Sequence, residues 1–189
     1  MNAPIDISTV TLHTPRLTLR PWQQSDLQDF YEYANVEGVG QMAGWMPHNS
    51  IEETRNILNS FITHRKTFAL EYCGKVIGSL GIEAYLEERF PELHALQGRS
   101  IGYVLSRNYW GQSLMPEAVR TVITYLFETL ELDFLLISHF TWNSRSRRVI
   151  EKCGFTFLRE TVHTTHYNTV EPTREYILYR KDWERYAHT

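Results

Sequence analysis

The clearest pattern of hydrophobic positions lies near the middle of the chain. Residues 101–105 read Ile-Gly-Tyr-Val-Leu and predict a strand, which a short turn follows. Beyond the turn, apolar side chains recur every three or four residues, as on the buried face of an amphipathic helix. These positions are Val119, Val122, Ile123, Leu126, Phe127 and Leu130. The chain is therefore expected to run from a strand, through a turn at residues 110–118, into a helix.

This turn is a candidate anion site. It contains Gly111 and Ser113, and Pro116 suits the first position of the helix, where a missing N–H costs nothing. The first turn of a helix has unpaired N–H groups and a partial positive charge. Such a turn favours a phosphate or pyrophosphate ligand, although a plain structural connection is the alternative interpretation.

The rest of the chain alternates between strand and helix patterns. Strands are predicted at residues 16–20, 67–72, 75–82, 134–141, 155–162 and 174–180, and helices at 25–34, 50–65 and 143–153. With the central strand and helix, this gives an α/β fold, a mixed α+β sheet of about seven strands with four helices. We expect one domain over residues 1–189, with residues 1–12 as a loose leader. The helix starts near Gly111 and Asn143 follow consecutive strands, so both can line one crevice.

Composition and charge narrow the class of partner. The net charge is −3 and the pI about 6.2, so no basic face for a nucleic acid is expected. No apolar run approaches the roughly 20 residues that span a bilayer, and no secretory signal is visible, so we expect no membrane partner. Cys73 and Cys153 match no metal-ligand spacing, so no metal is expected and a reduced, cytoplasmic setting is the simplest interpretation. Both a monomer and a homodimer remain open.

Four separated motifs give the chain a family resemblance. They are Thr14–Pro21 (TPRLTLRP), Arg99–Leu105 (RSIGYVL), Trp110–Ala118 (WGQSLMPEA) and Asn143–Phe155 (NSRSRRVIEKCGF). In this order they resemble the GNAT N-acetyltransferase superfamily, and within it the RimJ/RimL branch, which acetylates protein N-termini, including those of ribosomal proteins. The resemblance covers roughly residues 14–180. It implies the GNAT acyl-CoA N-acyltransferase fold and acetyl-CoA, which yields coenzyme A, as the co-substrate.

The resemblance also assigns residues to the cofactor. It implies that backbone N–H groups of the turn hold the pyrophosphate of acetyl-CoA, with support from its neighbours. The positions concerned are Gly111, Gln112, Ser113, Leu114, Met115, Pro116 and Glu117. It further implies that the backbone at Tyr103, Val104 and Leu105 pairs with the pantetheine amides, and that a free N–H there polarises the thioester carbonyl.

Two further features of the last motif, an asparagine and a cluster of arginines, each have two interpretations. Asn143 matches the residue that binds the pantetheine arm, and it is also a candidate helix N-cap. Arg145, Arg147 and Arg148 form a basic cluster that either is a solvated helix face or contacts the 3′-phosphate of coenzyme A. Of these, Arg147 is assigned to the cofactor.

The chain departs from the family pattern at two positions. Ser113 stands where the family usually has glycine, which costs on the order of 1 kcal/mol if φ must be positive there. Ile150 stands where many GNAT enzymes have a tyrosine acid. The resemblance then shifts the acid role to Ser146, which matches a serine near the sulfur of coenzyme A.

Acetyl transfer to an amine needs a neutral amine, a donor for the developing oxyanion and a hydrogen bond or proton for the leaving thiolate. Ser146 is the candidate for the last role, or a small helix residue packing on the sheet. Glu83, at the end of a hairpin strand, is the first candidate base, or a solvated acid. His166 is a second candidate, or a surface histidine. The acids between Glu83 and Glu92 either attract a cationic amine or form a plain exposed loop.

The leading hypothesis is an acetyl-CoA-dependent N-acetyltransferase in which a primary amine attacks directly in a ternary complex. A free α-amino group has a pKa near 8 and a lysine amine near 10.4, so a weak base suffices for a protein N-terminus of the ribosomal-protein-alanine type. A small-molecule amine acetyltransferase and a non-catalytic acyl-CoA-binding module are the alternatives.

Overall fold

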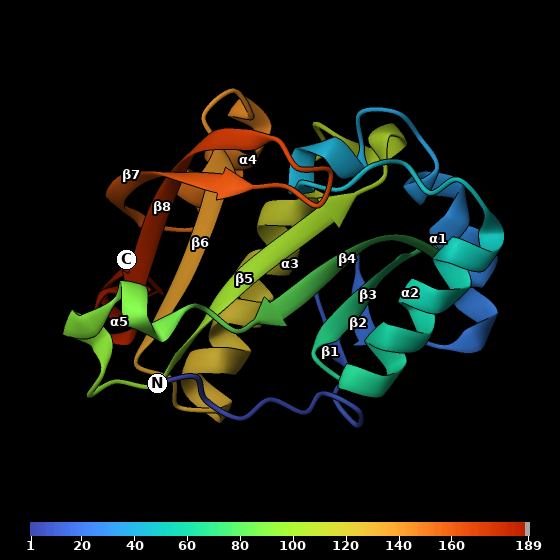
Figure 1. The fold of residues 1–189 in the computed structure, drawn as a ribbon. Helices are drawn as coiled ribbons and strands as arrows, with labels where there is room; N and C mark the ends of the chain where they lie inside the picture. Colours follow the sequence, from blue (N-terminus) through green and yellow to red (C-terminus); the bar gives the residue numbers. More distant parts are fainter. Residues whose placement is uncertain (188–189) are drawn as a thin grey trace.

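One mixed sheet runs through the computed structural model, which describes residues 1–187 (Figure 1). Its strand order is β1-β2-β3-β4-β5-β6-β8-β7. The strands are β1 Leu12–His13, β2 Thr18–Pro21, β3 Thr67–Tyr72, β4 Lys75–Glu83, β5 Gly98–Leu105, β6 Phe134–Phe140, β7 Thr156–Thr164 and β8 Val170–Tyr179. The β5–β6 pair is parallel, and the other neighbouring strands are antiparallel.

Helices cover both faces of this sheet (Figure 1). The α-helices are α1 Leu27–Ala34, α2 Ile51–His64, α3 Leu114–Thr124, α4 Ser144–Lys152 and α5 Arg180–Ala187, and a π-helical turn, Tyr125–Thr129, extends α3. The apolar stripe that the sequence predicted for α3 is buried with side chains of α4 and of the central strands. The helices α1 and α2 form a second core on the opposite face, against Ala69, Val76 and Val104.

The parallel strands β5 and β6 separate part-way along their length. They pair from Gly98↔Phe134 to Ile101↔Ile137, and β5 then continues without β6 as far as Leu105. Beyond that point β6 remains paired with β8. The separation leaves a gap within the sheet that lies directly beside the turn before α3.

The predicted count of about seven strands and four helices was too low for residues 1–187, which contain eight strands and five α-helices. The additional strand is β1, whose two residues are too few to show an alternating pattern. The additional helix is α5, where Trp183 is the buried anchor. The segment expected to be a loose leader packs on the body, with Ala3 3% and Ile7 1% exposed.

Local sequence explains several element boundaries. The Ser50 Oγ accepts a hydrogen bond from the Glu53 N–H at 3.1 Å, which is the predicted N-cap of α2. Cys73 and Gly74 have φ angles of 51° and 79°, as a two-residue hairpin turn requires. Before α1, Asp26 accepts a hydrogen bond from the Gln23 N–H at 2.8 Å in a capping box, and a 3-10 turn, Gln24–Asp26, leads into the helix.

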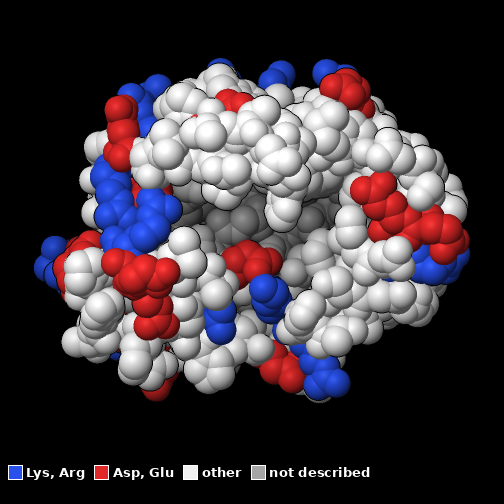
Figure 2. Space-filling view, viewed as in Figure 1, with Lys and Arg blue, Asp and Glu red and all other residues white. Residues whose placement is uncertain are grey.

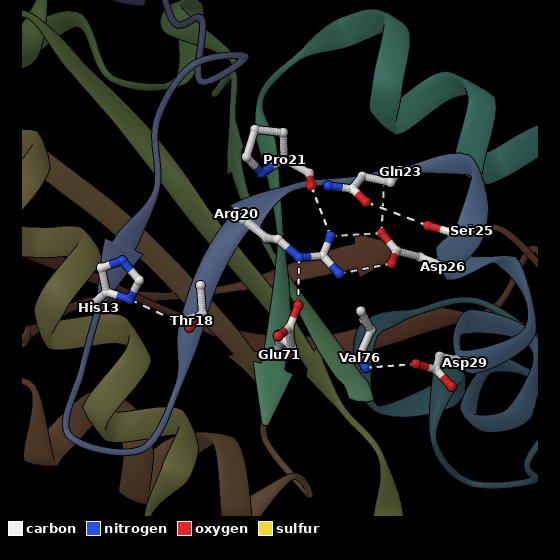
Figure 3. A network of polar contacts seen from close by, with 10 residues as sticks. All are labelled: His13, Thr18, Arg20, Pro21, Gln23, Ser25, Asp26, Asp29, Glu71 and Val76. Atoms are coloured by element: carbon white, nitrogen blue, oxygen red, sulfur yellow. Dashed lines mark hydrogen bonds and ion pairs between the residues drawn. The ribbon is translucent and has the colours of Figure 1, made fainter. Parts of the chain in front are cut away.

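A polar network ties β2 to its neighbours (Figure 3). The Arg20 guanidinium donates to both carboxylate oxygens of Asp26, at 2.9 and 2.8 Å, and to Glu71 at 2.7 Å. The side chains of Arg20 and Asp26 are only 16% and 6% exposed. This network fixes the start of α1 against the sheet, on the side away from the gap. Between residues 1 and 187, no helix is both long enough and apolar enough to cross a bilayer.

Candidate active site

A cavity of about 270 Å³ lies between β5, the start of α3 and the start of α4. Most of its lining comes from three segments that the sequence singled out. The lining residues are Val39, Met42, Tyr103, Val104, Leu105, Tyr109, Trp110, Gly111, Ser113, Leu114, Met115, Pro116, Asn143, Arg145, Ser146, Arg148, Val149 and Lys152. The structure thus brings together ten of the residues that were predicted to hold the cofactor.

The turn before α3 has an unusual backbone. Gly111 and Ser113 both adopt positive φ angles, 79° and 59°. Ser113 is the N-cap of α3, and its hydroxyl makes no capping hydrogen bond. A left-handed conformation costs a non-glycine residue about 1–2 kcal/mol, so the departure from glycine at this position carries a real strain. Pro116 is the third residue of α3, not the first as expected, but its missing N–H still falls in the turn where N–H groups are unpaired.

Two hydroxyl groups meet at the wall of the cavity. The Tyr103 Oη lies 2.9 Å from the Ser146 Oγ and 3.3 Å from the Ser146 carbonyl oxygen. Burial raises the pKa of the Tyr103 phenol well above its usual value, so the phenol keeps its proton at neutral pH. A protonated phenol that donates to Ser146 leaves the serine hydroxyl able to donate into the cavity. Ile150 is fully buried in the core below and offers no hydroxyl group.

Asn143 both caps α4 and links this helix to the loop that carries Met42. Its Oδ1 accepts from the Ser146 N–H at 3.1 Å, and its Nδ2 donates to the Met42 carbonyl at 3.2 Å. The predicted cap is therefore confirmed. Because both ends of the amide are engaged, Asn143 fixes the position of Ser146 relative to the loop that carries Met42.

The segment between α1 and α2, residues 35–50, crosses the open end of the gap, and we call it the strap. Besides the bond to Asn143, its Gly44 carbonyl accepts from the His166 N–H at 2.9 Å. Figure 1 shows the strap beside the tip of the β7–β8 hairpin. Val39 and Met42 line the cavity, so the strap closes one side of it.

Two predicted cofactor residues lie outside the cavity lining. The Gln112 side chain turns back to donate to the Asn108 carbonyl at 3.2 Å. Arg147 forms an ion pair with Glu151 at 2.7 Å on the exposed side of α4. Arg145 and Arg148 line the cavity instead, because residues one position apart on a helix point about 100° apart. Of the basic cluster, Arg145 and Arg148 rather than Arg147 are therefore placed to contact a ligand in this cavity.

The two candidate bases also lie outside the cavity lining. Glu83 forms an ion pair with Lys66, and its side chain is 43% exposed. His166 is exposed in the β7–β8 turn, where its backbone N–H contacts the strap. Neither residue has a contact with Ser146 or Tyr103 among the described residues.

The helices α1 and α2 cover only part of the sheet face opposite α3. Figure 2 shows a hollow near the middle of this face, with acidic and basic side chains beside each other at its edge. Ile101 and Tyr103 pack toward α3, so Gly102 between them faces the opposite side of the sheet, where a Cβ would meet nothing within 4 Å. Glu83 faces the same side, because its neighbour Ile82 is buried toward α3. The gap between β5 and β6 therefore has the cavity on one side and an open hollow on the other.

The thiol of Cys153 is buried and inert. Burial raises the pKa of the Cys153 thiol to about 12, so it is no nucleophile at neutral pH. Within the described part of the chain, no three histidine, cysteine, aspartate or glutamate side chains gather as metal ligands.

The sequence matches the family model of the acetyltransferase (GNAT) domain over residues 16–156, most of the chain. The chain belongs to the GNAT family of acetyltransferases. The predictions of the family, of its mixed α/β fold and of N-acetyltransferase activity are thereby confirmed. GNAT acetyltransferases take the acetyl group from acetyl-CoA.

Similar proteins agree with this GNAT assignment. The uncharacterized N-acetyltransferase p20 of Bacillus licheniformis is 26% identical over 153 residues, which are 77% of this chain and 82% of p20. A GNAT acetyltransferase from Bacillus anthracis superposes with a TM-score of 0.79 at 20% identity, over 91% of this chain and 99% of that one. RimL, a ribosomal L7/L12 alpha-N-protein acetyltransferase solved with coenzyme A, has a TM-score of 0.75 at 18% identity, over 90% and 98%.

The GNAT cavity fits the donor that the family uses. Main-chain N–H groups at the start of α3 suit a pyrophosphate, and the basic side chains of Arg145 and Arg148 suit further phosphate groups. Trp110 contacts both the end of β5 and the basic side chain of Arg145. Its Nε1 donates to the Leu105 carbonyl at 2.8 Å, and the Arg145 guanidinium stacks 4.8 Å from its ring. Sequence reasoning missed the Tyr103 hydroxyl, the strap and the stacking on Trp110, since each joins residues that no local spacing connects.

Proposed function

We propose that this GNAT acetyltransferase transfers the acetyl group of acetyl-CoA to the α-amine of a protein or peptide N-terminus. The observation that supports this acceptor is the open hollow on the face opposite α3, on the far side of the gap from the cavity (Figure 2). An open hollow has room for a polypeptide end, whereas a small amine is better served by an enclosed pocket. The name of RimL, an alpha-N-protein acetyltransferase, agrees with the same acceptor class.

In this proposal the cavity holds the cofactor. N–H groups of Ser113, Leu114 and Met115 bind the pyrophosphate, and Arg145 and Arg148 bind the remaining phosphate charge. The free edge of β5 at Tyr103 to Leu105 lies along the pantetheine arm and offers an N–H to the thioester carbonyl. Bound acetyl-CoA supplies an acetyl group activated by its thiol leaving group.

The proposed catalytic groups then act at the gap. The amine attacks from the hollow in its neutral form and loses one proton as the C–N bond forms, and the departing thiolate gains one proton to become the thiol as the C–S bond breaks. Ser146 donates a hydrogen bond toward the sulfur, and Tyr103 keeps the serine hydroxyl turned in that direction. Glu83 faces the hollow and is the proposed acceptor of the amine proton through water; His166 is its rival.

The experiment described below also distinguishes two other functions. A small-molecule amine acetyltransferase would use the same chemistry in a narrower acceptor site. A non-catalytic acyl-CoA-binding module is suggested by the strained Ser113 and by Ile150 in place of a tyrosine acid.

The deciding experiment measures thiol release from acetyl-CoA with a panel of acceptors. The panel contains peptides with free alanine, serine and methionine N-termini, the same peptides with blocked N-termini but a free lysine, and polyamines, amino acids and aminoglycosides. Release with the free N-termini alone supports the proposal. Release with small amines alone would replace the acceptor, and calorimetric binding of coenzyme A without turnover on any amine would favour the binding module.

A further inference from the structure

The segment that links β1 to β2 reaches across the molecule to the turn before α3. The Arg16 guanidinium donates through Nε and the second terminal nitrogen to Glu117 Oε2, at 2.8 and 2.6 Å. Its remaining nitrogen donates to the Gln112 carbonyl at 3.0 Å. The Arg16 N–H and the Thr14 hydroxyl both donate to the other oxygen of Glu117. One side chain thus holds the turn at two points, about a hundred residues away in sequence.

The bond to Gln112 fixes the direction of an N–H group. In a trans peptide unit the carbonyl and the following N–H point in opposite directions, and residues 1–187 contain no cis peptide bond. Arg16 does not line the cavity, and it holds the Gln112 carbonyl toward itself. The N–H of Ser113, which belongs to the same peptide unit, then points away from Arg16. This agrees with the lining, which includes Ser113 but not Gln112.

The bonds to Glu117 remove an unfavourable charge. Glu117 is the fourth residue of α3, so its carboxylate lies next to the turn where an anion would bind. Burial alone would raise the pKa of Glu117, but hydrogen bonds from Thr14 and Arg16 outweigh it and hold this pKa below the usual value. The carboxylate is therefore charged at neutral pH, and Arg16 neutralises it.

We propose that Arg16 is a positioning residue for the coenzyme: it orients the Gln112–Ser113 peptide unit toward the pyrophosphate and screens the phosphate charge from Glu117. This inference rests on the proposed placement of the pyrophosphate on the turn before α3. It adds to the site a side chain that does not line the cavity and that comes from the N-terminal part of the chain.

The two contacts can be separated by substitution. Arg16→Lys keeps a positive charge for Glu117, but one ammonium group cannot replace the planar fork that also reaches the Gln112 carbonyl. Arg16→Met removes both contacts and keeps the apolar stem. Thr14→Val is the matched control, because Thr14 donates to the same carboxylate but does not touch Gln112. For each variant, calorimetry gives the Kd of coenzyme A, thermal unfolding gives the Tm, and kinetics give KM and kcat for acetyl-CoA.

We expect the Kd of coenzyme A to rise about fivefold in Arg16→Lys and more than tenfold in Arg16→Met, as the loss of one and then two charge-assisted interactions requires. KM for acetyl-CoA should rise in parallel, kcat should change less than twofold, and Thr14→Val should bind like the wild type. Arg16→Lys is expected to keep a Tm close to that of the wild type, so it tests the inference even if Arg16→Met does not fold.

Three results would overturn the inference. The first is a folded Arg16→Lys or Arg16→Met protein whose Kd stays within twofold of the wild type. The second is a Thr14→Val protein that is weakened as much as Arg16→Lys, which would indicate a general disturbance of this corner. The third is a wild type that binds no coenzyme A, which would also end the proposed cofactor site. A wild type that binds coenzyme A but acetylates no N-terminus would overturn only the proposed acceptor, because the order of Kd values does not depend on turnover.

Discussion

Tyr103 and Ser146 meet at the wall of the cavity, with 2.9 Å between the phenol oxygen of a β5 residue and the hydroxyl oxygen of an α4 residue. Each residue comes from one side of the gap at which β5 and β6 separate. The contact places a donor beside the predicted path of the thioester. In the proposed mechanism, this pair takes the place of an acid group that Ile150 does not supply on α4.

Removing either hydroxyl should slow turnover without weakening the binding of coenzyme A. We expect Ser146→Ala to lower kcat about a hundredfold and Tyr103→Phe about tenfold, since a positioned proton donor contributes on the order of 10²-fold or more. The Kd of coenzyme A should stay within a few-fold in both variants. The measurements are steady-state kinetics and calorimetry. If Ser146→Ala weakens coenzyme A and leaves kcat unchanged, Ser146 is a cofactor ligand and not an acid.

The strain at Ser113 should be measurable. Ser113→Gly is expected to raise the free energy of unfolding by about 0.5–1 kcal/mol, because glycine adopts φ = 59° without the left-handed penalty but loses more entropy on folding. Gly111→Ala is the converse variant. It should cost about 1 kcal/mol from strain alone, since a Cβ at Gly111 would meet nothing within 4 Å. Urea unfolding of both variants measures these two changes in the free energy of unfolding. A Ser113→Gly protein less stable than the wild type would contradict the claim that the backbone is strained at Ser113.

The role of Glu83 can be read from the pH dependence of kcat/KM. If Glu83 accepts the amine proton, Glu83→Gln should lower activity and remove the acid side of the profile. Glu92→Gln alters an exposed acid of the following loop and should leave the profile unchanged. An unaltered profile in Glu83→Gln removes Glu83 as the base, and the same measurement on His166→Gln then tests its rival.

Two buried histidines should make the fold less stable in acid. Burial lowers the pKa of His48 and of His139 below the ordinary 6.5. Below pH 6.5 the unfolded chain therefore binds protons that the folded protein does not, so the free energy of unfolding falls as the pH drops toward the lowered values. Urea unfolding between pH 7.5 and 5.5 should show this fall. His139→Gln should make it shallower, whereas His13→Gln, at an exposed position, should not; equal slopes in both variants would refute the assignment.

The Arg20 network should stabilise the fold without affecting the binding of coenzyme A. Arg20→Met leaves the buried Asp26 carboxylate without its partner, which is expected to cost about 3 kcal/mol in urea unfolding. Arg55→Met breaks an exposed pair with Glu52 and should cost less than about 1 kcal/mol. Coenzyme A should bind both folded variants as it binds the wild type. A higher Kd in Arg20→Met would show that β2 affects the cofactor site by a route other than the Arg16 contacts.

Local patterns were sufficient for the framework of the site. The strand–turn–helix unit around Ser113, the hairpin at Cys73–Gly74 and the cap at Asn143 each depend on residues a few positions apart, and the structure has all three. The contacts that complete the site join distant residues, such as Tyr103 with Ser146 and Arg16 with Gln112. Periodicity carries no information about such pairs. The position of Arg147 outside the cavity lining has a related reason, because the rotation of α4 is set by its packing and not by its basic cluster.

The double engagement of Asn143 limits how this enzyme can change. The same amide holds the strap through Met42 and the start of α4 through Ser146. In the proposed mechanism, a substitution that reshapes the strap to admit a new acceptor therefore also displaces the hydroxyl group that assists thiol departure. The proposal thus couples acceptor choice to catalytic rate, and variants evolved for a new acceptor should first lose activity and recover it through second changes around Asn143.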